Sequence, residues 1–369
     1  MSPKWLFFPS QAGGIIDTLT VGDTEVFESA DTSYISITRM SDSQAIVCYS
    51  DVGNSNYGTA SLLSISGGVI SVEDTEVFES ATTSYISVTA IDGTHAVVCY
   101  RDEGNSNYGT ASLLSISESA ISVEDTEVFE SADTTYISAV TMDSTHAIVC
   151  YNDGGNSTYG TACCLSFADS AITAGSPTVF NSAQTDTISV YTIDSARAIV
   201  SYRTGGAAGK TCCLSLSETT ITAGTAQEFG SGTVYDISVC ALSTSQALVT
   251  YYDSGKSYKC MMSLVGINST TLSVGTPAEF DSSISLMKIS KLNESQAVMI
   301  YKDDGNNQYG TALILTVDGS NITSAGEVVF ESAASTYLSI SLLSSNRHIV
   351  AYKDGGNSSY GTATLITAS

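Results

Sequence analysis

In five places an aspartate, an asparagine and a tyrosine recur at fixed spacing, and their side chains could together bind a sugar. They stand in the pattern Asp-x-Gly-Asn-(Ser/Asn)-x-Tyr-Gly-Thr-Ala. Carboxylate and amide groups can exchange hydrogen bonds with vicinal hydroxyls, and an aromatic face can cover the apolar C–H side of a pyranose. The candidate ligand-binding residues are Asp51, Asn54, Tyr57, Asp102, Asn105, Tyr108, Asp153, Asn156, Tyr159, Asp303, Asn306, Tyr309, Asp354, Asn357 and Tyr360.

The same pattern is also typical of a structural turn or of a cation site. Gly and Asn tolerate positive φ and Asp can cap its own backbone, so every repeat could keep this segment as a tight turn without any ligand. Alternatively, the aspartate and backbone carbonyls could hold a cation such as Ca²⁺, which prefers oxygen ligands. We predict no cofactor and keep calcium as the alternative.

No other set of residues predicts catalysis or a metal site. His95 and His146 share a repeat position that holds Gln or Arg elsewhere, which indicates a polar residue at the start of a strand. Cys48, Cys99 and Cys150 share a position that becomes Ser, Thr, Ile or Ala in other copies, which indicates packing. The sequence has no nucleotide-binding loop, no HExxH and no nucleophile elbow. We therefore predict no catalytic residue, no metal ligand and no enzyme.

The elements that must position the candidate residues come from an internal repeat. Two independent landmarks each return seven times, at intervals of 49 to 51 residues for the first. The first is a phenylalanine and the second is a tyrosine that ends an apolar run. The phenylalanines are Phe27, Phe78, Phe129, Phe180, Phe229, Phe280 and Phe330. The tyrosines are Tyr49, Tyr100, Tyr151, Tyr202, Tyr251, Tyr301 and Tyr352.

Each repeat contains four strand-like runs and no helix. In the second copy these runs are Tyr85–Thr89, His95–Tyr100, Tyr108–Ser117 and Ile121–Phe129. Short β-rich runs separated by turn residues predict an all-β fold, and four strands per unit of about 50 residues predict a β-propeller blade. The sequence therefore predicts a seven-bladed β-propeller of four-stranded blades.

The two ends of the chain predict how the ring closes. The chain starts with a fourth-strand equivalent, 15–27, and ends after a third-strand equivalent, 360–367. We predict that the N-terminal strand completes the last blade and removes a bare sheet edge. Residues 1–369 then form a single domain, in which residues 1–14 are an extension that packs on the closing blade.

Loops of a sheet with up-and-down strands alternate between its two ends. The Asp/Asn/Tyr loop and the Phe-Glu-Ser-Ala loop that precedes the first strand should therefore share one face. The second of these loops ends at a tyrosine in four copies. These tyrosines are Tyr34, Tyr85, Tyr136 and Tyr337.

Tandem units of the form YISV-ALD-x-T-x-x-VVCY-x-D-x-GNS-x-YGTA resemble propeller repeats of uncharacterised bacterial surface proteins and of viral or phage structural proteins. The resemblance covers nearly the whole chain. It implies the propeller fold and, as one setting, a virus or phage particle. It implies no catalytic motif.

Composition limits the partners. There are 38 acidic and 13 basic residues, for a formal net charge of −25. Nucleic-acid binding needs clustered Lys and Arg, so we predict no nucleic-acid partner and no docking on anionic lipid. No apolar stretch is long enough for membrane insertion, and no signal peptide is evident, so we expect synthesis in the cytoplasm.

Nine cysteines, an odd number with two vicinal pairs, favour free buried thiols. Acidic residues recur on the fourth strand, where they should keep edge strands apart.

The fourth and fifth blades depart from the loop pattern at 204–210 and 253–257, which predicts a site there for a protein assembly partner. For the whole chain we predict a non-enzymatic recognition module that binds a glycan or a cell-surface receptor through the repeated loops. The alternatives are a structural or assembly propeller that binds protein, and an enzyme that uses the central channel.

Overall fold

The computed structural model describes residues 16–369 apart from 118, 169, 257–258 and 281–282. In this part of the chain all regular structure is β-strand, except for four three-residue 3₁₀ turns at Val52–Asn54, Glu103–Asn105, Gly154–Asn156 and Ser254–Lys256. The all-β class is thus confirmed. No described helix is long and apolar enough to cross a membrane. The predicted N-terminal extension, residues 1–14, lies outside the described residues.

Backbone hydrogen bonds join the strands into three sheets of 13, 9 and 5 strands. The largest contains β22 (Ile284–Lys291), β23 (Gln296–Asp303), β24 (Tyr309–Asp318), β25 (Asn321–Ser344), β26 (Arg347–Asp354), β27 (Tyr360–Ala368), β1 (Leu19–Ser41), β2 (Gln44–Asp51), β3 (Tyr57–Ser66), β4 (Val69–Ala90), β5 (His95–Asp102), β6 (Tyr108–Ser117) and β7 (Ala120–Glu130). The second contains β15 (Thr220–Ala223), β14 (Ala208–Ser217), β13 (Arg197–Thr204), β12 (Thr178–Asp194), β10 (Tyr159–Ala168), β9 (His146–Asp153) and β8 (Thr134–Asp143), with β11 (Ala171–Ala174) and β16 (Gln227–Gly230) at its side. The third contains β17 (Val234–Ser243), β18 (Gln246–Asp253), β19 (Lys259–Asn268), β20 (Thr271–Val274) and β21 (Ala278–Phe280).

These sheets differ from the seven separate four-stranded sheets that the sequence predicts. The difference arises because one strand serves two repeats. β4 pairs with β3 as far as Thr82 and with β5 from Thr83 onward, so it is the outer strand of one repeat and the inner strand of the next. The Phe-Glu-Ser-Ala segment, which the sequence predicts to be a loop before the first strand, is therefore extended backbone in this repeat (79–84). β1, β12 and β25 continue in the same way. Elsewhere two separate strands take the outer and inner positions, namely β7 and β8 in one place and β16 and β17 in another.

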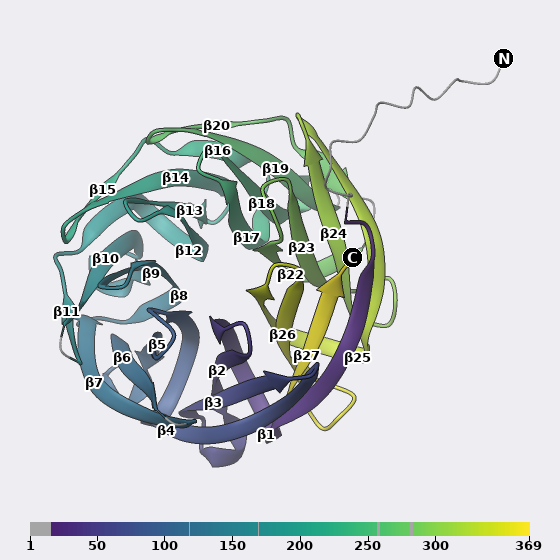
Figure 1. Cartoon of the computed structure of the whole chain (residues 1–369). Coiled ribbons are helices and arrows are strands. Elements are labelled where there is room, and N and C mark those ends of the chain that lie inside the picture. The colour runs from purple at the N-terminus through teal and green to yellow at the C-terminus, as the bar shows by residue number, and fades with distance from the viewer. Residues whose placement is uncertain (1–15, 118, 169, 257–258, 281–282) are drawn as a thin grey trace.

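The first and last strands of the chain pair with each other. β1 runs antiparallel to β27, from Leu19 opposite Ala368 to Asp31 opposite Tyr360. The inner strands β1, β4, β8, β12, β17, β22 and β25 each contact the next in this order, and β25 contacts β1. Figure 1 shows these strands around a central axis, with the purple N-terminal strand beside the yellow C-terminal one.

The core lies between neighbouring repeats. All seven landmark tyrosines are fully buried, and each packs against the landmark phenylalanine of its repeat. For example, the ring centroids of Phe78 and Tyr100 are 5.1 Å apart. The glycine of the preceding Tyr-Gly-Thr-Ala segment is needed here, because a Cβ at Gly58 would come within 2.4 Å of the Phe78 ring. The nine cysteines are buried and free, as predicted.

The fifth repeat shows what this glycine does. Cys260 takes the glycine position, and the partner phenylalanine, Phe280, is displaced. Its ring lies 6.4 Å from that of Tyr301, whereas the other six pairs are separated by 4.8 to 5.3 Å.

A serine on six of the seven inner strands links consecutive repeats. The Ser36 hydroxyl accepts a hydrogen bond from the Val88 N–H at 3.1 Å, and the Ser87 hydroxyl accepts one from the Ala139 N–H at 3.0 Å. Among the described residues there are six such bonds, and one of them joins β25 to β1 through Ser339. The six serines are Ser36, Ser87, Ser138, Ser189, Ser238 and Ser339. The seventh position is Lys288.

Aspartates make a second link on the outer strands of three junctions. Asp23, Asp74 and Asp125 each accept the N–H of an isoleucine 47 residues further along the chain, at 2.9, 2.7 and 2.9 Å. The acidic pattern of the fourth strand therefore includes residues that join repeats.

We expect Ser87→Ala to lower the free energy of unfolding by about 1 kcal/mol, because the Ala139 N–H loses its acceptor. Urea unfolding followed by circular dichroism measures the change. The control is Ser115→Ala, which removes a hydroxyl that bonds Glu124 on the exposed surface. Equal midpoints for the two variants would contradict a role for the inner serine.

His348 is buried at a position that holds alanine in the other six repeats. Its Nε2 lies 3.3 Å from the Lys291 carbonyl oxygen, and its Nδ1 has no partner. Burial lowers the pKa of His348 from its ordinary value of 6.5 to about 4. The folded protein therefore holds this imidazole neutral.

His348 should make the protein less stable as the pH falls. Below pH 6.5 this histidine is protonated in the unfolded chain, whereas in the folded chain it stays neutral until about pH 4. The free energy of unfolding therefore falls by up to about 1.4 kcal/mol for each pH unit in this window. We expect His348→Ala to remove this part of the pH dependence. Unfolding midpoints of both proteins at pH 7.5 and 4.5 test it, and parallel losses would contradict it.

Candidate functional site

The predicted Asp/Asn/Tyr segments are turns at one end of the molecule, each between two paired strands. In the first copy Asp51 ends β2, Asn54 closes a 3₁₀ turn and Tyr57 opens β3 opposite Asp51. The turn bonds to the segment preceding the next inner strand, since the Thr83 N–H donates to the Asn56 carbonyl oxygen at 3.0 Å. The two recurrent segments therefore share a face, as predicted.

The carboxylates of these aspartates accept hydrogen bonds from backbone N–H groups of their own turns. The Asp102 carboxylate accepts the N–H groups of Gly104 and Asn105 at 2.9 and 3.1 Å, and the other four copies accept one or two equivalent bonds. Four of the five aspartates are buried and Asp303 is half-buried. The asparagines are exposed and the tyrosines are half-buried. This is the geometry of a capped structural turn, and it leaves Asn and Tyr as the accessible groups.

Positive φ falls on other residues than the sequence suggests. In the first turn it occurs at Ser55 and Asn56, not at Gly53 or Asn54. Gly53 is required by space, because its Cβ would meet that of Ala30 at 2.4 Å.

In the fourth repeat both the aspartate of the turn and the glutamate near it are replaced by other residues. Thr204 stands in the aspartate position, and its hydroxyl accepts a hydrogen bond from the Asn181 amide at 2.8 Å. In the first repeat the corresponding pair is Asp51 and Glu28. Burial and the charge of Asp51 raise the pKa of Glu28. The predicted assembly site at the fourth and fifth repeats stays a prediction.

A row of tyrosines lies at the same end and is absent from the predicted ligand-binding residues. Tyr337, Tyr34, Tyr85 and Tyr136 come from four successive repeats, with ring centroids 5.5, 5.4 and 5.3 Å apart. These separations are typical of interacting aromatic rings. Burial raises the pKa of Tyr34 and of Tyr85, so both hydroxyls stay protonated. We call these four residues the tyrosine row.

The backbone at this position is left-handed in all seven repeats. φ lies between 49° and 55° at Tyr34, Tyr85, Tyr136, Thr187, Asp236, Leu286 and Tyr337. Each of these residues sits in a register shift between the inner strand and its neighbour. Left-handed backbone costs a side-chain-bearing residue about 1–2 kcal/mol, and bulges of this kind commonly re-aim a side chain beside a binding site.

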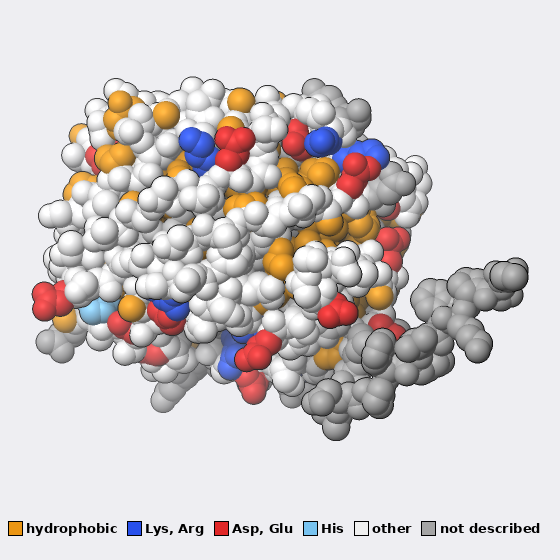
Figure 2. Space-filling view, turned by 90° about the horizontal axis from the view of Figure 1, so that it is seen from above, with side chains coloured by type: hydrophobic (Ala, Val, Ile, Leu, Met, Phe, Trp, Pro, Cys, Tyr) orange, Lys and Arg blue, Asp and Glu red, His pale blue; other side chains and the backbone are white. Residues whose placement is uncertain are grey.

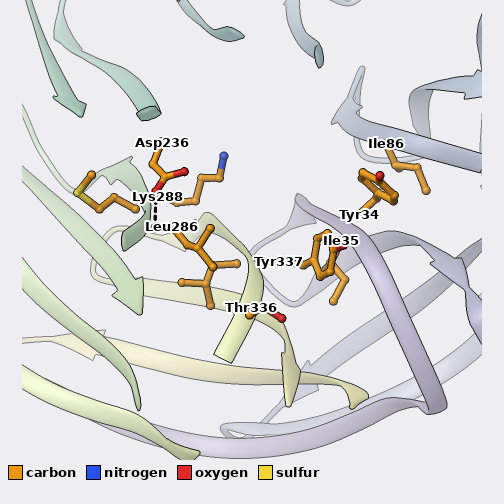
Figure 3. Close-up of a pocket in the computed structure, with 10 residues that line it drawn as sticks. Tyr34, Ile35, Ile86, Asp236, Leu286, Lys288, Thr336 and Tyr337 are labelled. Atoms are coloured by element: carbon orange, nitrogen blue, oxygen red, sulfur yellow. Dashed lines mark hydrogen bonds between the residues drawn. The ribbon is translucent and has the colours of Figure 1, made fainter. Parts of the chain in front are cut away.

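Four of the seven left-handed residues, Tyr34, Asp236, Leu286 and Tyr337, line a cavity of about 480 Å³. Tyr34 and Tyr337 line one side of it, and Asp236, Leu286 and Lys288 line the other (Figure 3). Small-molecule pockets commonly measure roughly 300–1,000 Å³. We call this cavity the axial pocket.

Lys288 and Asp236 are the charged groups of the axial pocket. Asp236 accepts the Leu286 N–H at 3.0 Å. The Lys288 side chain is exposed to the pocket. Desolvation by the surrounding protein lowers the pKa of Lys288, and the charge of Asp236 opposes the shift. The signal that could have found both residues is their departure from the tyrosine and serine of the aligned repeats.

Elsewhere in the described residues many basic side chains are paired with acids. Arg101 contacts Glu103 and Asp133 at 2.9 and 2.8 Å, and Lys353 contacts Asp31 at 2.5 Å. Figure 2 shows such blue and red side chains next to one another near the edges of a largely uncharged side surface. No group of three or more His, Cys, Asp or Glu side chains within the described ranges is placed to hold one metal ion.

No family model and no curated protein matches this sequence. Several solved structures are similar in fold. The BP39L lectin from Burkholderia pseudomallei is 9% identical, with a TM-score of 0.61 over 95% of this chain and 96% of the lectin. The periplasmic gluconolactonase PpgL of Pseudomonas aeruginosa is 10% identical, with a TM-score of 0.56 over 86% of this chain and 97% of that chain. A Dyadobacter fermentans protein of unknown function is 10% identical, with a TM-score of 0.53 over 95% and 99%. At these identities the likeness is one of fold alone.

The turn geometry predicts different effects for neighbouring residues of one loop. We expect Asp102→Ala to lower the free energy of unfolding by about 1 kcal/mol, since two backbone N–H groups lose their acceptor. Asn105→Ala should leave stability within about 0.5 kcal/mol, because its side chain is exposed. Urea unfolding of both variants measures this, and the reverse order would contradict the capping role.

Proposed function

We propose that the chain is a seven-bladed β-propeller whose N-terminal strand completes the last blade. Three observations support this architecture. The same bulge recurs seven times, β1 pairs with β27, and each inner strand contacts the next around the axis. The likeness to propeller-like solved structures is consistent with it.

On this architecture we propose a non-enzymatic recognition module that binds carbohydrate on the face bearing the tyrosine row. The observation that carries the proposal is the row itself, with four rings held in line by a left-handed backbone. Aromatic faces cover the C–H side of a sugar, and half-buried tyrosines keep hydroxyls for hydrogen bonding. The similar structures include a lectin, which fits this proposal. They also include a gluconolactonase, but the residues that line the axial pocket do not specifically favour that activity.

The repeated loops surround this face and remain the second part of the proposal. Their exposed asparagines and half-buried tyrosines could supply several weak sites, and repetition on one rigid body would raise avidity. A setting in a virus or phage particle, and a protein receptor or assembly partner in place of a glycan, stay predictions from the sequence.

A glycan array with two pairs of variants tests the function and locates it. We expect Tyr34→Thr with Tyr85→Thr to abolish binding, because the row loses its two central faces. Threonine is a matched replacement, since Thr187 adopts φ of 49° at the same position. Tyr108→Ala with Tyr159→Ala should weaken only binding that depends on the loops.

Circular dichroism and melting temperature control for folding in both pairs. Binding that survives the first pair and disappears in the second would move the site to the loops. If the wild-type protein binds no glycan at all, the recognition proposal is wrong and the assembly alternative gains support.

A further inference from the structure

The ring of serine bonds is incomplete at one place. At six junctions an inner-strand serine accepts the N–H of the next repeat, and at the seventh Lys288 stands where the serine would be. Ile340 occupies the same repeat position as Ile37, whose N–H bonds Ser339 at 3.1 Å. The Ile340 N–H faces a lysine, which has donors only, so it lacks the serine acceptor.

The junction between β22 and β25 therefore has two hydrogen-bond donors, the Lys288 ammonium and the Ile340 N–H, and lacks the serine acceptor. The Lys288 ammonium carries three N–H groups, and none has a hydrogen bond or ion pair among the described residues. Ile340 lines the space next to the axial pocket and adds one more donor. The Lys288 side chain is exposed to the axial pocket, so a ligand oxygen at this point could accept hydrogen bonds from its ammonium.

The opposite wall of the axial pocket is aromatic. Tyr337 is 39% exposed and forms that wall with Tyr34. One oxygen of Asp236 accepts the Leu286 N–H, and its remaining acceptor capacity is open to the pocket. The pocket thus offers a cation and a hydroxyl acceptor on one side and an apolar face on the other.

We propose that the axial pocket binds a carboxylate-bearing sugar, such as a uronic or sialic acid, with its carboxylate on Lys288 and its ring against Tyr34 and Tyr337. This rests on the proposed carbohydrate-binding function and names its ligand class. A carboxylate bonded to an ammonium forms a charge-assisted hydrogen bond, which is about twice as strong as a neutral one. Lys288 is a single ammonium next to the negative charge of Asp236. It therefore suits a carboxylate, which carries one negative charge, better than a phosphate, which carries about two.

The chain supplies its own control for this site. Lys288→Ser installs the residue that the other six repeats carry, so it should keep the fold, with a melting temperature at or above that of the wild-type protein. It removes the cation and supplies the seventh acceptor. Lys291→Ser, three residues further along β22, changes the net charge equally but lies at another part of the channel. Lys288→Arg keeps a cation in place.

Isothermal titration with D-glucuronate, N-acetylneuraminate and D-glucose tests the proposal. We expect at least one acidic sugar to bind the wild-type protein tenfold or more tightly than D-glucose. Lys288→Ser should weaken that binding at least tenfold and change D-glucose binding less than twofold. Lys288→Arg should stay within about threefold of wild type, and Lys291→Ser should match wild type.

Equal losses in Lys288→Ser and Lys291→Ser would overturn the proposal, and so would equal affinities for acidic and neutral sugars. If neither acidic sugar binds while the glycan array shows binding that needs Tyr34 and Tyr85, the inference fails and the carbohydrate function stands. If the array shows no binding at all, both fail.

Discussion

The hydrogen bond from a backbone N–H of one repeat to a serine hydroxyl of the preceding repeat is the interaction on which the arrangement of inner strands depends. Each inner strand pairs on one edge only, so its other N–H groups face the axis and need acceptors. A serine side chain is short, and it reaches the next strand only at one separation and one register. The serines therefore help to fix the spacing of the repeats on the inside of six junctions, and Asp23, Asp74 and Asp125 do so on the outside of three junctions.

The hydrophobic core also depends on contacts between adjacent repeats, because its side chains come from both. Phe78 opens one repeat, yet its ring occupies the space left by Gly58 of the repeat before it and packs on Tyr100 of its own. Replacing this glycine by Cys260 in the fifth repeat moves Phe280 away from Tyr301. Stability in such repeat proteins lies largely in nearest-neighbour contacts, so a single unit could not keep this geometry alone.

Repetition explains how much the sequence predicts. The phenylalanine and tyrosine landmarks mark core positions because burial tolerates few replacements, and they correctly locate strands such as β5 and β6. The continuous course of β4 through 79–84 was not predicted, because the segment looks polar and turn-like on its own. The left-handed backbone at Tyr34 was not predicted either, since tyrosine carries no signal for positive φ and the bulge arises from pairing with β2. The axial pocket combines side chains from repeats more than 250 residues apart, for which no local pattern exists.

Departures from the repeat, rather than the repeat itself, give the axial end its chemical character. Seven identical positions would surround the axis with identical side chains, and such a surface would offer a small ligand no preferred orientation. Instead, four successive repeats keep tyrosine, while the next three carry Thr187, Asp236 and Leu286. Lys288 replaces the serine in the last of these three. The turn pattern is lost in two of the same three repeats, at 204–210 and 253–257. Four successive repeats thus present an aromatic surface at this end and the following repeats present charge, an arrangement that suits the proposed ligand with an apolar face and a charged group.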